Sequence, residues 1–166
     1  MTEIDPAARR EPRLDEDEMR RAIELLYFAY RGFTGEADTI LAEIGMGRAH
    51  HRAIYFIGRN PGITVSALLG ILRITKQSLA RVLSELVREG YVTQAMGPVD
   101  RRQRLLTLSP KGDALERQLT ARQSRLLARA FANAGPPGTE VFRRMLEALV
   151  AEPDRRLLPP SSRGGG

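Results

Sequence analysis

The chain has 166 residues and 42% of them are hydrophobic, which is enough for one domain with its own core and some additional helices. Its formal net charge of +6 favours a polyanionic partner. It contains no cysteine, which excludes disulfides, thiolate metal sites and thiol redox sensing.

The N-terminal part predicts an irregular arm followed by a long amphipathic helix. Residues 1–14 mix Pro, Arg and Glu without helical periodicity, and we expect a disordered arm there. Asp15 followed by Glu18 is typical of a capping box, so the helix should begin at this point. We expect Gly32 and Gly35 to bend it before it continues to Ile44, ahead of a break at Gly45-Met46-Gly47. The apolar stripe over its first four turns comprises Met19, Ala22, Ile23, Leu26, Tyr30 and Phe33.

The central part predicts three helices with clear start and stop signals. The first runs from about Arg48 to Gly58 and ends at Asn60-Pro61-Gly62. Thr64 and Thr75 stand where N-caps belong, ahead of two short helices that are joined by a tight turn. In the second of these, apolar residues at i, i+3, i+4 and i+7 mark the inner face: Leu79, Val82, Leu83 and Leu86.

Beyond Gly90, a C′ glycine, the pattern changes to two short strands and then returns to helix. The strands are expected at Tyr91–Ala95 and Arg104–Leu108. Ser109-Pro110 is typical of an N-cap and a first helical position, and the helix that it starts should reach about Asn133. A last helix is predicted from about Thr139 to Ala151, and residues 153–166 are expected to form a disordered tail. We expect Val92, Leu106 and Leu108 to face inward.

This order of elements predicts a mainly α fold with a small β-hairpin. It is a single domain of residues 15–152, with a winged helix-turn-helix at about residues 48–109. The flanking helices, at about residues 15–46 and 110–151, carry apolar stripes longer than the small central unit can cover. We therefore expect them to be dimerisation helices in a two-fold homodimer.

Positive charge gathers on the predicted second helix of the helix-turn-helix and on the loop between the strands. Residues 73–104 hold seven basic and three acidic residues, a net charge of +4, whereas residues 1–18 hold seven acids and three arginines. The start of a recognition helix reads base edges in the major groove, where Lys and Arg suit guanine and Gln suits adenine. An Arg of the loop suits the narrow minor groove, and Asp100 would hold a loop Arg by a charge-assisted hydrogen bond. The candidate DNA-binding residues are Thr75, Lys76, Gln77, Ser78, Arg81, Asp100, Arg101, Arg102 and Arg104.

The same segment resembles the MarR family of bacterial winged-helix regulators. The resemblance is carried by Ile74-Thr75-Lys76-Gln77-Ser78, by Leu86-Val87-Arg88-Glu89-Gly90-Tyr91-Val92, by Asp100-Arg101-Arg102 and by Leu108-Ser109-Pro110-Lys111-Gly112. It implies a homodimer, built from the first, fifth and sixth helices, on a pseudo-palindromic promoter site. It also implies that Lys76, Gln77, Ser78 and Arg81 meet the major groove, while Arg102, oriented by Asp100, enters the minor groove and Arg101 contacts the backbone. Met96-Gly97-Pro98-Val99 departs from the family, because many members carry an additional charge there.

Members of this family often bind a small aromatic or anionic molecule between the dimer helices and the DNA-binding lobe. Ordinary packing at a dimer seam is the competing interpretation of the polar and aromatic residues at that place. His50 and His51 are neighbours on a helix and therefore point apart, so we expect no metal site and no cofactor. The ligand-pocket candidates are Tyr27, Tyr30, Arg31, His50, His51, Arg52 and Tyr55.

Other classes of function fit less well. The chain has no glycine-rich phosphate loop, no metal-ligand set and no nucleophile–base pair, so we do not expect an enzyme. Two alternatives remain: an architectural DNA-binding protein, which would bind all sequences similarly, and a winged-helix protein-interaction module, which should lack the arginines of the helix and wing. The absence of an apolar run of 18 residues and the acidic N-terminus predict a cytoplasmic, nucleoid-associated protein.

Overall fold

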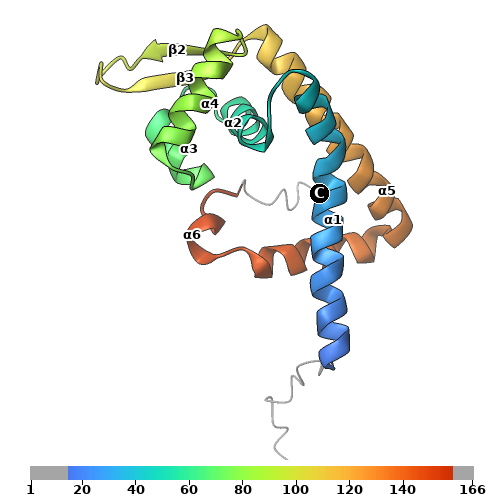
Figure 1. Cartoon of the computed structure of the whole chain (residues 1–166). Coiled ribbons are helices and arrows are strands. Elements are labelled where there is room, and N and C mark those ends of the chain that lie inside the picture. The colour runs from blue at the N-terminus through green and yellow to red at the C-terminus, as the bar shows by residue number, and fades with distance from the viewer. Residues whose placement is uncertain (1–14, 159–166) are drawn as a thin grey trace, which may run out of the picture. The chain divides into compact units, whose positions relative to one another are not determined.

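The computed structural model describes residues 15–158 (Figure 1). The arm predicted for residues 1–14 and the last part of the predicted tail, residues 159–166, lie outside this range. The chain divides into two units, Met1–Gly35 and Glu36–Gly166. Between residues 15 and 158 no helix combines the length and the apolar character that crossing a bilayer requires.

Helix α1 (Glu16–Glu43) begins with the predicted capping box. The main-chain N–H of Glu18 donates to the Asp15 carboxylate at 2.8 Å, and that of Asp15 donates to the Glu18 carboxylate at 3.1 Å. The helix continues through Gly32 and Gly35 without interruption. It ends where Gly45 adopts a left-handed conformation, with φ of 71°, which confirms the predicted break.

Each of the two helices of the helix-turn-helix begins at one of the predicted threonine caps. The Thr64 hydroxyl accepts from the N–H of Ala67, and the Thr75 hydroxyl accepts from the N–H of Ser78, both at 3.1 Å. These bonds satisfy main-chain donors that a helix leaves without partners in its first turn. The helices of this segment are α2 (Arg48–Arg59), α3 (Val65–Leu72) and α4 (Lys76–Arg88).

The sheet has three antiparallel strands in the order β1-β3-β2, one more than the predicted hairpin. Strands β2 (Val92–Met96) and β3 (Arg104–Leu108) lie within one residue of their predicted ranges. Strand β1 (Ile63–Thr64) was missed because two residues are too short to show an alternating pattern. Its Ile63 pairs with Leu106, which anchors the start of α3 to the hairpin.

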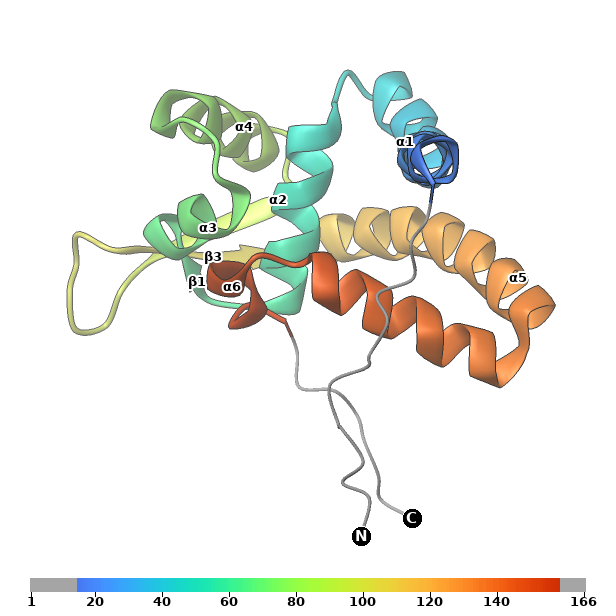
Figure 2. The same cartoon turned by 90° about the horizontal axis from the view of Figure 1, so that it is seen from below.

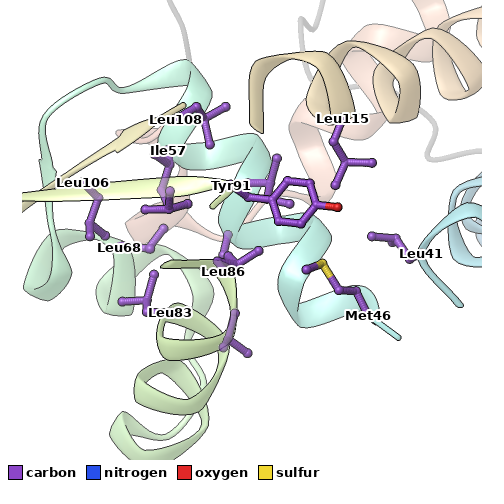
Figure 3. Close-up of a cluster of buried hydrophobic side chains, with 14 of the residues drawn as sticks. Leu41, Met46, Ile57, Leu68, Leu83, Leu86, Tyr91, Leu106, Leu108 and Leu115 are labelled. Atoms are coloured by element: carbon purple, nitrogen blue, oxygen red, sulfur yellow. The ribbon is translucent and has the colours of Figure 1, made fainter. Parts of the chain in front are cut away.

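The core of the second unit lies where α2, α4 and β3 meet (Figure 3). The predicted inward residues Val92, Leu106 and Leu108 are all buried, as is the predicted apolar face of α4. Tyr91 closes this core on the side of α5, where a Cβ atom on Gly112 would lie only 2.0 Å from the Tyr91 carbonyl oxygen. Only glycine therefore allows α5 to start this close to the hairpin.

Helix α5 (Pro110–Leu149) starts at Ser109, whose hydroxyl accepts from the N–H of Gly112 at 3.1 Å, as predicted. Gly135, with φ of 67° and ψ of 176°, breaks it into two segments, and the chain reverses there (Figure 2). This is the helix end predicted at the Gly-Pro-Pro-Gly sequence. Helix α6 (Glu152–Arg155) follows, so the prediction of an unstructured tail from Pro153 is wrong for this short stretch. Pro153 lies in the first turn, where its missing N–H costs nothing.

Candidate nucleic-acid interface

The fold directs one face of α4 into the core and the opposite face outward. Leu79, Val82, Leu83 and Leu86 are at most 3% exposed. Lys76, Gln77 and Arg81, on the other side of the same helix, are exposed. The predicted base-reading residues therefore stand together on the face of α4 that lies opposite its buried apolar residues.

The first turn of α4 offers hydrogen-bond donors to an acceptor outside the chain. The Thr75 hydroxyl accepts from the N–H of Ser78 and itself donates to Ser78 Oγ at 2.8 Å. Because Ser78 Oγ receives this proton, its own hydroxyl hydrogen is left to point elsewhere. The first turn carries no acidic residue, so the positive end of the helix dipole is not neutralised. An anion such as a phosphate is favoured at this position.

The acidic residues of the segment are engaged within the chain. Glu85 Oε2 lies 2.6 Å from His50 Nε2, and Glu89 pairs with Arg88 at 3.0 Å. In the part of the chain that the structure describes, no ion pair involves the remaining basic residues of the helix face and wing. These are Lys76, Arg81, Arg101, Arg102 and Arg104, and all five are exposed.

The loop of residues 97–103 projects from the last strand pair, Met96 with Arg104 (Figure 1). The N–H of Gly97 donates to the Gln103 carbonyl at 3.0 Å, and the N–H of Gln103 donates to the Asp100 carbonyl at 3.1 Å. A Cβ atom on Gly97 would lie 2.7 Å from the Asp100 carbonyl oxygen, so this tight loop requires glycine there. In this loop, called the wing below, Arg101 and Arg102 are both exposed.

Asp100 acts differently from the prediction. Its carboxylate accepts a 2.9 Å hydrogen bond from the main-chain N–H of Arg102, not from a guanidinium. Aspartate commonly bonds the main chain two residues later, because its side chain has the length to close such a turn. Asp100 therefore shapes the wing backbone, and the Arg102 guanidinium is not occupied by it.

The predicted ligand-pocket residues divide between the two units. Tyr27, Tyr30 and Arg31 belong to the first unit, where both tyrosines are exposed. His50 in the second unit is only 6% exposed and uses both ring nitrogens. Nδ1 accepts from the N–H of Gly47 at 3.2 Å, and Nε2 bonds Glu85. His50 could therefore bind a ligand only by giving up these bonds. The other second-unit candidates are His51, Arg52 and Tyr55, of which His51 and Tyr55 are half-buried and Arg52 is exposed.

His51 lies near a small group of charged residues. Burial lowers its pKa below the usual value of 6.5, and the carboxylates of Asp38 and Glu116 offset part of this effect. Asp38 Oδ2 accepts from Nε and Nη2 of Arg48 at 2.9 and 2.8 Å. The net effect favours the neutral imidazole of His51.

One groove in the second unit could hold a small molecule. A shallow, open groove of about 400 Å³ lies at the reversal of α5, and none of the predicted ligand residues lines it. No group of three or more His, Cys, Asp and Glu side chains suited to a metal ion occurs among residues 15–158. The groove is lined by Phe131, Ala132, Gly135, Pro136, Thr139, Glu140 and Arg143.

Two polar contacts between distant residues were not predicted from the sequence. His50 bonds Glu85, 35 residues away, and Arg73 Nη2 lies 2.9 Å from Asp154 Oδ1, 81 residues away. Neither pair has a local signal, because nothing in a single sequence couples residues so far apart.

Comparisons with known proteins agree with this architecture. The sequence model of the MarR family matches residues 44–103. The HTH-type transcriptional regulator PetP of Rhodobacter capsulatus is 46% identical over 143 residues, which cover 86% of each chain. This relative is thus a transcriptional regulator.

Solved structures of the same fold include two with DNA. FabT of Streptococcus pneumoniae in complex with DNA has a TM-score of 0.71 and 21% identity, covering 79% of this chain and 94% of FabT. A mutant MarR from E. coli complexed with operator DNA has a TM-score of 0.63 and 20% identity, covering 83% of this chain and all of that one. By its sequence and its fold, this chain belongs to the MarR family and is a DNA-binding transcriptional regulator of the winged helix-turn-helix type.

Proposed function

We propose that the protein binds a pseudo-palindromic promoter site as a homodimer, with one copy of α4 and of the wing on each half-site. The observation that carries this proposal is the set of exposed basic side chains at the start of α4 and in the wing, whose acidic neighbours Glu85 and Asp100 bond to partners within the chain. Such residues suit a nucleic acid, because basic side chains bind its phosphates and polar side chains can recognise its bases.

The exposed face of α4 would read the major groove. Lys76 and Arg81 supply donors for guanine, and the Gln77 amide pairs with adenine through one donor and one acceptor. Ser78 and the N–H groups of the first turn suit a phosphate, because they offer donors at the positive end of the helix dipole. In this arrangement, sequence preference depends on Gln77 and its two basic neighbours.

The wing would contact the minor groove and the adjacent backbone. Arg102 is exposed, and its backbone direction is set by Asp100. A narrow minor groove has an enhanced negative potential that attracts an arginine side chain. Arg101 and Arg104 would bind phosphates, so the wing contributes mainly affinity.

Exposed apolar side chains support the homodimer. In the described part of the first unit, Ile23 is 63% exposed and Leu26 is 54% exposed. In the second unit, Met145 is 62% exposed, in the last segment of α5. Ile23 and Leu26 are three residues apart on α1 and so share a helix face, and an exposed apolar face of this kind usually marks an interface. A two-fold dimer would present two reading helices to half-sites about one helical turn apart.

A small aromatic or anionic effector is the second part of the proposal. Tyr55 and His51 are half-buried on α2, and the neighbouring Arg52 is exposed. Such residues suit an aromatic acid. A thermal-shift screen of aromatic carboxylates tests this part: a compound that raises the melting temperature and alters DNA affinity supports it. No shift with any of them at millimolar concentration counts against it.

The main test is fluorescence anisotropy with the DNA upstream of the protein's own coding sequence, against random duplex of equal length, at rising salt. A preference for the upstream DNA that persists at moderate salt supports specific regulation. We propose that this regulation takes place in the cytoplasm, at the nucleoid. Equal affinities would instead favour an architectural DNA-binding protein.

Sedimentation measures the oligomeric state of the protein and so tests the proposed dimer independently of DNA binding. Ile23→Lys places a charge in the exposed apolar surface of α1, whereas Glu24→Lys makes the same new side chain at the next, polar position. We expect Ile23→Lys to sediment as a monomer with much weaker DNA binding, and Glu24→Lys to remain a dimer.

A further inference from the structure

His50 joins two separate parts of the second unit. It lies in the first turn of α2, three residues after Gly47, the N-cap at the break between α1 and α2. Its Nδ1 accepts from the N–H of Gly47 at 3.2 Å. Its Nε2 lies 2.6 Å from Oε2 of Glu85, on α4. The imidazole therefore bridges the break before α2 and the recognition helix.

These contacts define the proton positions on the ring. A main-chain N–H can only donate, so Nδ1 must present its lone pair to Gly47. The proton of the neutral ring is then on Nε2, which donates to the Glu85 carboxylate. Both ends of the side chain are satisfied in one tautomer, and the hydrogen bond to the carboxylate is charge-assisted.

The link to Glu85 differs in kind from the other anchors of α4. The remaining buried contacts of this helix are apolar: Leu79, Val82, Leu83 and Leu86. The hydrophobic effect that drives apolar packing is itself non-directional. A short hydrogen bond to a carboxylate is directional, so this contact adds an angular restraint on α4 that apolar contacts do not supply.

We propose that His50 and Glu85 are a positioning pair that sets the rotation of α4 and hence the sequence preference of Lys76 and Gln77. The inference rests on the proposed function, because it assumes that α4 reads the major groove. The pair does not touch DNA in this scheme. It also turns the negative charge of Glu85 away from the face that would meet phosphates.

Two variants of His50 separate its two bonds. The amide oxygen of Asn lies near the place of Nδ1, so His50→Asn keeps the acceptor for Gly47 and loses the bond to Glu85. The amide nitrogen of Gln lies near the place of Nε2, so His50→Gln keeps a donor for Glu85. On α4, Glu85→Gln keeps an acceptor and Glu85→Ala removes it. Glu89→Gln, at the C-cap of α4, controls for the loss of one negative charge.

The readout is the ratio of affinities for the upstream site and for random duplex, with melting temperature measured on each variant. We expect His50→Asn and Glu85→Ala to lower the ratio about tenfold, as expected for one hydrogen bond to a charged group, while binding to random duplex stays unchanged. His50→Gln, Glu85→Gln and Glu89→Gln should keep the ratio within about threefold. The double variant His50→Asn with Glu85→Ala should lose no more than either single variant, because both remove the same bond.

The outcomes distinguish this inference from the proposed function. A wild-type protein without preference for the upstream site would overturn the proposed function and this inference with it. A wild type with that preference, whose Glu85→Ala variant keeps the full ratio, would overturn the positioning pair alone. If His50→Asn does not fold, Glu85→Ala compared with Glu85→Gln decides the question. If the affinity for the upstream site, the affinity for random duplex and the melting temperature all fall together, the pair has a purely structural role and the positioning role is overturned.

Discussion

The carboxylate of Asp100 accepts a 2.9 Å hydrogen bond from the main-chain N–H of Arg102. This bond explains why an acidic residue stands at the tip of a loop that is otherwise suited to DNA. The carboxylate closes a turn and leaves the guanidinium of Arg102 available. What matters at position 100 is then an acceptor of the right length, rather than a negative charge.

Asp100→Asn tests this explanation, with Asp100→Ala as its partner. Asparagine keeps a side-chain acceptor and removes a charge that repels phosphates, so Asp100→Asn should bind DNA as tightly as the wild type or more tightly. Asp100→Ala loses the turn and should bind about three- to tenfold more weakly, by anisotropy at fixed salt. If Asp100→Asn bound DNA as weakly as Asp100→Ala, the negative charge at position 100 would itself be required.

Gln77→Ala and Arg102→Ala should differ in what they change. Loss of the Gln77 amide should cost about 1–3 kcal/mol on the preferred site and little on a site altered at the base pair that it reads. Loss of the Arg102 guanidinium should weaken binding to all sequences and reduce the slope of log affinity against log salt by about 1. Competition binding on a panel of single-base variants of the site, at several salt concentrations, measures both.

Gln77→Ala would contradict the assignment of Gln77 to base readout if it weakened DNA binding uniformly across the whole panel. That outcome would place the amide on the DNA backbone. A change in preference at a single base pair by Arg102→Ala would give the wing a role in direct base readout.

Gly112→Ala should strongly destabilise the second unit. The added Cβ would lie 2.0 Å from the Tyr91 carbonyl oxygen, and because that oxygen belongs to the main chain, the start of α5 would have to shift. We expect a loss of roughly 3 kcal/mol or more in the free energy of unfolding. Gly70→Ala is the matched control, because Gly70 lies inside α3 with no atom within 4 Å of the new Cβ. It should raise stability by about 0.5–1 kcal/mol. Urea titration measures both, and equal effects would contradict the close approach.

His51 should make stability fall in mild acid. Burial lowers its pKa in the folded state below 6.5, so the unfolded chain binds the additional proton more readily. The stability of the wild type should therefore be fully present above pH 6.5 and decline as pH falls from 6.5 through the lowered pKa. His51→Gln removes this titration, so the wild type should lose more stability than the variant between pH 7.5 and 5.5. Parallel curves of melting temperature against pH would show that burial does not shift this group.

Local signals in the sequence predicted most of the fold. Thr64, Thr75 and Ser109 are cap residues whose side chains act within three residues, so a single stretch contains the whole interaction. The apolar period of α4 and the alternation in β3 likewise depend only on neighbouring residues. The predicted resemblance to the MarR family is confirmed by the family match and by PetP.

The features that were missed depend on contacts between distant residues. Strand β1 exists because Ile63 meets Leu106, and α6 is tied to the helix-turn-helix because Asp154 meets Arg73. The partner of Asp100 could not be predicted either, because a main-chain N–H and a guanidinium of the same residue are equally near in sequence. The DNA contacts and the ligand pocket stay predictions.

The most direct test of sequence-specific binding by a dimer is selection of bound duplexes from a random pool, followed by sequencing. The proposed function predicts enrichment of an inverted repeat whose half-sites have centres about 10 base pairs apart, and loss of that enrichment in Ile23→Lys. A pool that remains random after repeated rounds, or an enriched motif without two-fold symmetry, would contradict it.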